Sequence, residues 1–104
     1  MRDLKESRDA IRAIDVQMAS LFIQRMEVVR DVARYKYVND LPIEDKEQEA
    51  RVLSERSAQI DDKELRPYFE EFLQNTMDVS KSFQNHLINA WQINRNISEE
   101  DSQQ

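Results

Sequence analysis

A mostly apolar series of positions runs through the first 36 residues at alternating steps of three and four, the spacing of side chains that share one helix face. This series, here called the apolar seam, consists of Leu4, Ser7, Ile11, Ile14, Met18, Leu21, Arg25, Val28, Val32 and Tyr35. The unbroken register predicts one helix from about Asp3 to about Lys36, roughly 50 Å long. A compact monomer of this size has a radius of gyration of only about 13 Å, so the helix must extend beyond it. A second copy related by a two-fold axis is the economical cover for the seam.

The residues after this helix predict a turn and a short second helix. Residues 39–41 precede Pro42, and proline disfavours helical backbone in the residue before it. Asp45 with Gln48 three residues later resembles a capping box. We therefore expect a helix from Asp45 to about Ile60, with few apolar residues.

A third helix follows, and Asp61 and Asp62 are suited to cap it, with Pro67 tolerated near its first turn. Its inward face is predicted to consist of Leu65, Phe69, Phe72, Leu73, Thr76, Met77, Ser80, Phe83, Leu87 and Trp91. Residues 94–104 are polar and unpatterned, which predicts a frayed tail after a helical domain over residues 1–93. No strand pattern competes, so the fold class is all-α: one long, one short and one medium helix, intertwined in a homodimer.

Composition excludes several classes of site. The chain has 104 residues, which suits one domain with a modest core. The absence of glycine excludes Gly-rich phosphate loops, and the absence of cysteine excludes disulfides, thiolate zinc sites and thiol nucleophiles. No paired metal-ligand spacing is present, so a metal is not predicted.

The start, MRDLKESRDA, lacks the apolar core of a signal peptide, and no apolar run approaches membrane-spanning length. We expect a cytoplasmic protein without a membrane partner.

The formal net charge of −6 is spread unevenly along the chain. Residues 1–36 carry eight Lys or Arg against six Asp or Glu, and the remainder carries seven against fifteen. The acidic total argues against a nucleic-acid partner, because nucleic-acid-binding proteins present a basic face. Any anionic ligand must therefore be bound by a few local cations.

Arg25 places a full charge on the apolar seam. An unpaired buried guanidinium destabilises a fold by about 3 to 5 kcal/mol, so an anion should lie beside it, either a carboxylate of the protein or a ligand. Arg8 flanks the same seam, but it lies about 25 Å from Arg25 along the helix axis. The two arginines of one helix cannot bind one small molecule, whereas two antiparallel first helices would bring Arg8 of one copy to Arg25 of the other.

Further polar residues share the helical spacing of four. Asp45 and Glu49 are neighbours at the start of the second helix, and Ser80 and Gln84 are neighbours on the third. Each has an ordinary explanation by itself: a helix cap, a solvated carboxylate or a core hydroxyl, and for Arg25 a structural ion pair. Together with Lys36, Arg8 and Arg25, the set is more typical of a pocket for a small polyanion than of packing.

These residues resemble the all-helical class of chorismate mutase over about residues 4–90. The resemblance rests on an ordered set of positions: Arg8, Ile11, Ile14, Asp15, Leu21, Arg25, Lys36, Pro42, Ile43, Glu44, Asp45, Glu49, Ser80 and Gln84. It implies an intertwined three-helix dimer with two equivalent sites. The implied activity is the Claisen rearrangement of chorismate to prephenate on the route to phenylalanine and tyrosine, without a cofactor or covalent intermediate.

The resemblance also implies a role for each site residue. Arg25 and the partner copy's arginine at position 8 would bind the two substrate carboxylates, and Ser80 would line the carboxylate end. Lys36 and Gln84 would donate to the ether oxygen, and Asp45 and Glu49 would address the hydroxyl side. A pericyclic step needs only a substrate held in its reactive chair and donors where negative charge grows, and these residue types supply both.

Two positions depart from the family pattern. Gln48 stands where many relatives carry another arginine, so a neutral donor replaces one cationic contact with the substrate. Ser7 stands where a leucine is usual, which weakens packing beside Arg8. Two other functions stay open: an isochorismate-pyruvate lyase on the same scaffold, and a non-catalytic helical interaction or regulatory dimer.

Overall fold

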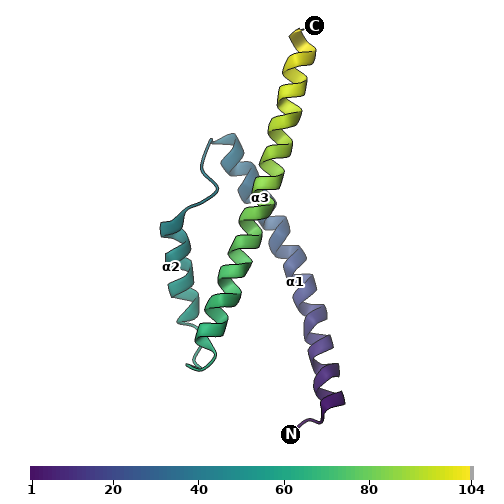
Figure 1. The fold of residues 1–104 in the computed structure, drawn as a ribbon, viewed down its shortest axis with the longest axis vertical. Coiled ribbons are helices and arrows are strands. Elements are labelled where there is room, and N and C mark those ends of the chain that lie inside the picture. The colour runs from purple at the N-terminus through teal and green to yellow at the C-terminus, as the bar shows by residue number, and fades with distance from the viewer. Residues whose placement is uncertain (104) are drawn as a thin grey trace.

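The computed structural model describes residues 1–103, which form three helices and no strand (Figure 1). Helix α1 spans Leu4–Val38, α2 spans Lys46–Ser57 and α3 spans Arg66–Gln103. The all-α class and the order of one long helix, one short helix and a further helix are confirmed, although α3 is longer than α1.

Both ends of α1 are capped by polar residues near the predicted bounds. The Asp3 carboxylate accepts a hydrogen bond from the backbone N–H of Glu6 at 2.8 Å. At the other end, the N–H of Leu41 donates to the carbonyl of Lys36 at 2.8 Å, and Asp40 takes a left-handed φ of 54°. Glycine usually fills this position, and aspartate tolerates it better than most residues. The predicted turn over residues 39–41 is therefore confirmed in a chain that has no glycine.

Helix α2 is capped as predicted but ends earlier. The Asp45 carboxylate accepts from the backbone N–H of Gln48 at 3.0 Å. The returning half of the capping box is absent, because the Gln48 side chain accepts from Arg51 at 3.2 Å instead. The helix ends at Ser57 rather than Ile60, where a turn leads toward α3.

Helix α3 begins with Pro67 in its first turn, as expected, and Asp62 accepts from the backbone N–H of Glu64 at 2.9 Å just before it. Its other end differs from the prediction, since residues 95–103 continue the helix. No proline or glycine stops the helix after Pro67, and an ion pair one turn apart, Arg95 to Glu99 at 3.4 Å, supports the extension. The domain limit at residue 93 stays a prediction.

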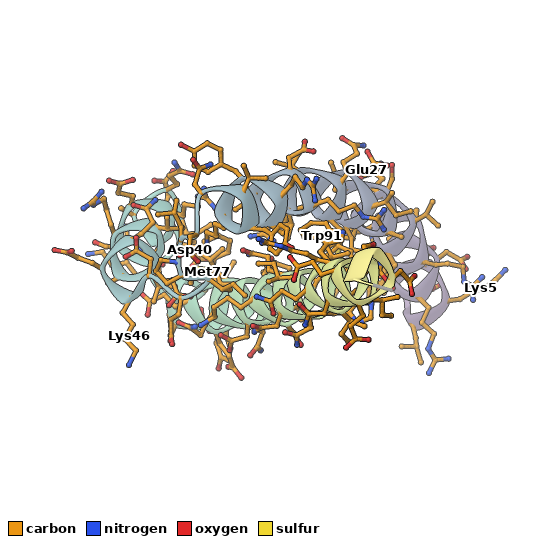
Figure 2. The ribbon with its side chains drawn as sticks, turned by 90° about the horizontal axis from the view of Figure 1, so that it is seen from above. Lys5, Glu27, Asp40, Lys46, Met77 and Trp91 are labelled. Atoms are coloured by element: carbon orange, nitrogen blue, oxygen red, sulfur yellow. The ribbon has the colours of Figure 1, made fainter. Side chains whose placement is uncertain are left out.

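Helix α3 packs against both other helices. In Figure 1, the middle of α3 crosses the second half of α1, and α2 lies beside the first half of α3. Seen from above in Figure 2, Trp91 lies between α1 and α3, while Lys5 and Lys46 point outward. The Trp91 ring lies 5.6 Å from that of Tyr37, as centroid distance. The buried apolar side chains are few: Val29, Ala33, Leu73 and Met77.

The apolar seam does not face α3. The buried residues of α1 are Val29 and Ala33, each one position after a member of the seam, whereas the large apolar seam residues are 41 to 64% exposed. Two residues of the inward face predicted for the third helix are exposed as well, Leu65 in the turn before α3 and Phe72 on α3. Helix α1 thus carries two adjacent apolar faces, and the single chain covers only one.

The single chain is extended. It measures 71 × 32 × 15 Å, and its radius of gyration is 19.1 Å, against about 13 Å for a compact domain of this length. The first half of α1 diverges from α3 and ends far from it (Figure 1). Within residues 1–103, none of the helices has the apolar length that a membrane crossing requires. The cytoplasmic location stays a prediction.

Candidate functional site

Arg25 joins α1 to α3 in the middle of the crossing. Its guanidinium donates a hydrogen bond to the Ser80 hydroxyl, and that hydroxyl donates in turn to the backbone carbonyl of Thr76 at 2.9 Å. Ser80 is buried, with 6% of its surface exposed, and Arg25 is half-buried. The serine therefore uses its single proton on its own helix and presents a lone pair to the arginine.

No carboxylate of the described residues forms an ion pair with Arg25. Burial lowers the pKa of the Arg25 guanidinium, and the positive charge of Arg56 lowers it further. Both causes disfavour the charged form, so the folded chain holds this cation at a cost in free energy. The sequence left open whether the anion is a protein carboxylate or a ligand, and residues 1–103 of one chain do not provide the carboxylate.

Gln84 lies one turn beyond Ser80 on α3. It is only 6% exposed, and its side-chain Oε1 is buried without a hydrogen-bond partner among the described residues. Buried polar atoms are nearly always paired, so such an atom needs an explanation. The missing partner of Oε1 is a donor, and an amide turned by about 180° presents its NH2 group instead, which suits the same anionic ligand as Arg25.

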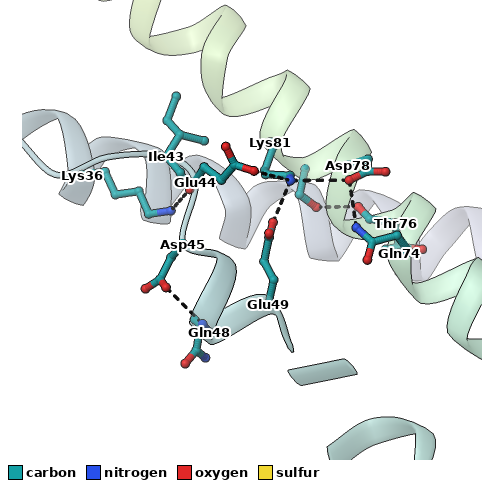
Figure 3. A network of polar contacts seen from close by, with 11 residues as sticks. Lys36, Ile43, Glu44, Asp45, Gln48, Glu49, Gln74, Thr76, Asp78 and Lys81 are labelled. Carbon is teal, nitrogen blue, oxygen red and sulfur yellow. Dashed lines mark hydrogen bonds and ion pairs between the residues drawn. The ribbon is translucent and has the colours of Figure 1, made fainter. Parts of the chain in front are cut away.

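Lys36 and Asp45 organise the connection between α1 and α2. The Lys36 ammonium donates to the backbone carbonyl of Ile43 at 2.8 Å, which ties this connection to the end of α1. In Figure 3, Lys36 points toward the stretch that carries Ile43 and Asp45. Since Asp45 caps α2, its carboxylate already has one donor in the backbone N–H of Gln48.

Glu49 faces a lysine that the sequence analysis missed. The Lys81 ammonium lies 2.8 Å from the Glu49 carboxylate, 3.5 Å from that of Asp78 and 3.8 Å from that of Glu44 (Figure 3). The hydrogen bond to Glu49 is the main cause that raises the pKa of Lys81, so this lysine stays charged. The sequence does contain one indication that Lys81 lies near the site. It follows Ser80 directly and precedes Gln84 by three residues, so it lies near both on the helix surface.

An open cavity of about 400 Å³ lies beside this cluster, lined by Ile43, Glu44, Lys81 and Asn85. Neither Lys81 nor Asn85 was among the predicted site residues. The cavity lies where the connection after α1 approaches α3, and Glu44 and Lys81 are part of both the cavity and the cluster.

The remaining predicted residues lie apart from this region. Arg8 is exposed in the second turn of α1, near the far end of the molecule. Gln48 is exposed, and its side chain points away from Lys81 in Figure 3. One chain thus brings Arg25, Ser80 and Gln84 to the α1–α3 crossing, and Lys36, Asp45 and Glu49 to the region around α2, but it leaves Arg8 outside.

The described residues contain no cluster of three or more His, Cys, Asp or Glu side chains that could hold a metal ion. Compared with known protein families, residues 7–85 match the model of chorismate mutase type II. None of the solved structures matches the chain.

Proposed function

The chain belongs to the chorismate mutase type II family, and we propose that Arg25, Ser80 and Gln84 form the centre of its active site. The activity is that of the family, the rearrangement of chorismate to prephenate, which makes the protein an isomerase. The observation that carries the proposed site is the half-buried Arg25, which has no carboxylate partner among the described residues and donates to Ser80, one turn of α3 before the unsatisfied Oε1 of Gln84.

The proposed mechanism needs no nucleophile and no general base. Chorismate carries two carboxylates, and Arg25 binds one of them with a charge-assisted hydrogen bond. Ser80 accepts from Arg25 and thereby fixes the direction of the guanidinium. Bound in this way, the substrate is held in the chair in which the bond-forming carbons meet.

Donors then stabilise the charge that develops on the ether oxygen as its C–O bond breaks. Gln84 offers an amide N–H as one donor. Lys36 offers an ammonium with three protons, one of which is donated to the Ile43 carbonyl. Asp45 and Glu49 address the substrate hydroxyl from α2. Gln48 adds no charge, because it is an amide that already accepts from Arg51.

The second carboxylate requires a second chain. Arg8 and Arg25 are separated by about 25 Å along α1, which is too far for one small ligand. The apolar seam between them is exposed over its whole length in the single chain. An antiparallel pairing of two α1 helices about a two-fold axis covers the seam and brings Arg8 of each copy to the other copy's Arg25.

The direct test is to follow the loss of chorismate absorbance with purified protein and to identify the product. We expect prephenate. Release of pyruvate from isochorismate, with chorismate untouched, would identify the lyase alternative. If the protein acts on neither substrate, the remaining explanation is a non-catalytic interaction or regulatory dimer.

The pH dependence tests the assignment of Gln84. An amide donates without titrating, so wild-type activity should stay nearly flat between about pH 6 and 8, where no proposed catalytic group has its ordinary pKa. A carboxyl at this position donates only when protonated, and its ordinary pKa is about 4.3. The Gln84→Glu variant should therefore lose kcat as the pH rises, with an optimum moved toward acid.

The measurement is kcat against pH for both proteins, with circular dichroism as the control that both remain folded over the range. A bell-shaped wild-type profile centred near neutrality would contradict the assignment.

A further inference from the structure

Lys81 is the one cation in the described ion pairs that meets several carboxylates at once. Its ammonium lies within 4 Å of Glu44, Glu49 and Asp78, which come from the connection before α2, from α2 and from α3. The contact with Glu49 is the shortest, at 2.8 Å, and both side chains are largely shielded, with 23% and 21% exposed. The other two carboxylates are more than half exposed.

This arrangement matters for a substrate with two negative charges. Glu44 lines the cavity, and Glu49 and Asp78 contact the lysine that lines it, so the three carboxylates together would repel such a substrate before any chemistry. The cations of α2, which are Lys46, Arg51 and Arg56, form no ion pair with these carboxylates in the described structure, and Gln48 is neutral and points away from the cluster. In the described structure, the positive charge of Lys81 offsets the negative charges of these three carboxylates.

We propose that Lys81 is a positioning residue of the active site, which holds Glu49 toward the substrate hydroxyl and offsets the negative charge around the cavity. It acts through Glu49 and does not need to touch the substrate. The proposal rests on the function proposed above, in which Glu49 addresses that hydroxyl. It also explains how the site operates with glutamine at position 48, because the compensating cation comes from α3 instead of α2.

A purely structural salt bridge is the competing explanation. An ion pair with a purely structural role would affect the stability of the fold, and it would leave little trace in catalysis as long as the variant stays folded. The two roles differ in what they require of Glu49. A positioning role disappears when Glu49 loses its charge, whereas a role in holding α2 against α3 through the other carboxylates does not.

The test is a double-substitution cycle in steady-state kinetics on chorismate. Lys81→Met removes the charge but keeps the length of the side chain, and we expect kcat/KM to fall about tenfold or more, mainly through a higher KM. The loss should shrink at high ionic strength, because salt screens the repulsion that the variant exposes. Lys81→Arg should retain most of the activity, since it keeps the cation.

The second arm of the cycle removes the partner. In a Glu49→Gln background, adding Lys81→Met should lower kcat/KM by a clearly smaller factor than in the wild type, because Glu49 no longer has to be held and only the charges of Glu44 and Asp78 remain to be offset. Lys63→Met is the matched control: it makes the same chemical change at an exposed lysine in the turn before α3 and should leave the kinetics unchanged.

Three results would overturn the proposal. The kcat/KM of Lys81→Met could match that of the wild type, or Lys81→Met could lower kcat/KM by the same factor with Glu49 and with Gln at position 49. In the third, Lys81→Met and a second neutral variant, Lys81→Gln, both unfold, which would make the lysine structural. These results are distinct from failure of the proposed function. A wild type without activity on chorismate would remove that function and this inference together, whereas an active wild type with an unaffected Lys81→Met would remove only the inference.

Discussion

Replacing Arg25 with alanine should lower kcat/KM on chorismate by several orders of magnitude while leaving the three-helix fold intact. The loss is large because a desolvated, charge-assisted pair with a substrate carboxylate is worth several kcal/mol at the transition state, and each 1.36 kcal/mol is about tenfold in rate. Arg25 is held half-buried beside Ser80, and no carboxylate of the described chain pairs with it.

The fold should survive because burial disfavours the Arg25 charge in the free protein, which offsets the hydrogen bond to Ser80 that the variant loses. Burial lowers the pKa of its guanidinium, so the folded state disfavours the charge, and alanine removes that penalty. Ser80 keeps its hydrogen bond to the Thr76 carbonyl in the variant. We therefore expect the melting temperature of unliganded Arg25→Ala to stay close to that of the wild type.

The matched control is Arg12→Ala, the same change at a highly exposed arginine of the same helix, where only a 3.9 Å pair with Asp9 is lost. Its kinetics should match the wild type. If Arg25→Ala unfolds, and if substrate or product does not raise the wild-type melting temperature, Arg25 is a structural residue and the proposed site is wrong.

The elements of this fold could be predicted because each is set by local signals. Asp45 caps α2 and the residues before Pro42 break the chain, as helix chemistry requires. The end of a helix was harder to predict where the sequence contains no helix-breaking residue. Residues 95–103 lack an apolar pattern, but they also lack a helix breaker, so α3 continues through them.

The packing face of α1 could not be predicted in the same way. Leu21, Val28 and Val32 lie on one apolar face, and Val29 and Ala33 lie on the next, so periodicity alone cannot decide which face meets α3. In the structure, Val29 and Ala33 of α1 are buried where α1 meets α3, and the more regular seam stays exposed. The regularity of the seam is what a long helix pair needs, and packing within one chain does not need it.

The site was predictable where a polar residue interrupts an apolar face. Arg25 and Ser80 were predicted as candidates in this way and Gln84 by its spacing of four from Ser80, and the structure brings the three to the α1–α3 crossing. Lys81 was missed because a lysine among acidic residues of a helix is typical of a solvated face. Only the approach of Glu44 and Glu49 from another part of the chain distinguishes it.

The three proposed cations of the catalytic constellation all come from α1. Arg8, Arg25 and Lys36 lie on the segment with a net positive charge, while α2, α3 and their connections carry the excess of acidic residues. A substrate with two carboxylates must therefore meet α1 twice. Arg8 and Arg25 of one straight helix lie too far apart to bind one small ligand, so we expect the second contact to come from another copy of the same helix.

Mixing two inactive variants should then restore activity. In an Arg8→Ala dimer and in an Arg25→Ala dimer, every site lacks one carboxylate contact, so both should be nearly inactive. After the two are unfolded together and refolded, about half of the dimers are mixed. Each mixed dimer has one site with both defects and one site with neither, because the intact Arg8 and the intact Arg25 come from different chains. About a quarter of all sites, and roughly that fraction of wild-type activity, should return.

The matched control is the same experiment with Arg25→Ala and Gln84→Ala. These two side chains belong to one chain's part of the site, where Ser80, which accepts from Arg25, lies one turn from Gln84. In a mixed dimer of this pair each site keeps exactly one of the two defects, so none is whole and activity should not return. Recovery in the first pair without recovery in the second would locate the shared site between Arg8 of one chain and Arg25 of the other. If mixed dimers are shown to form by differential tagging and the first pair recovers nothing, the two arginines do not meet across the two-fold axis, and the second carboxylate of the substrate must be bound by a different residue.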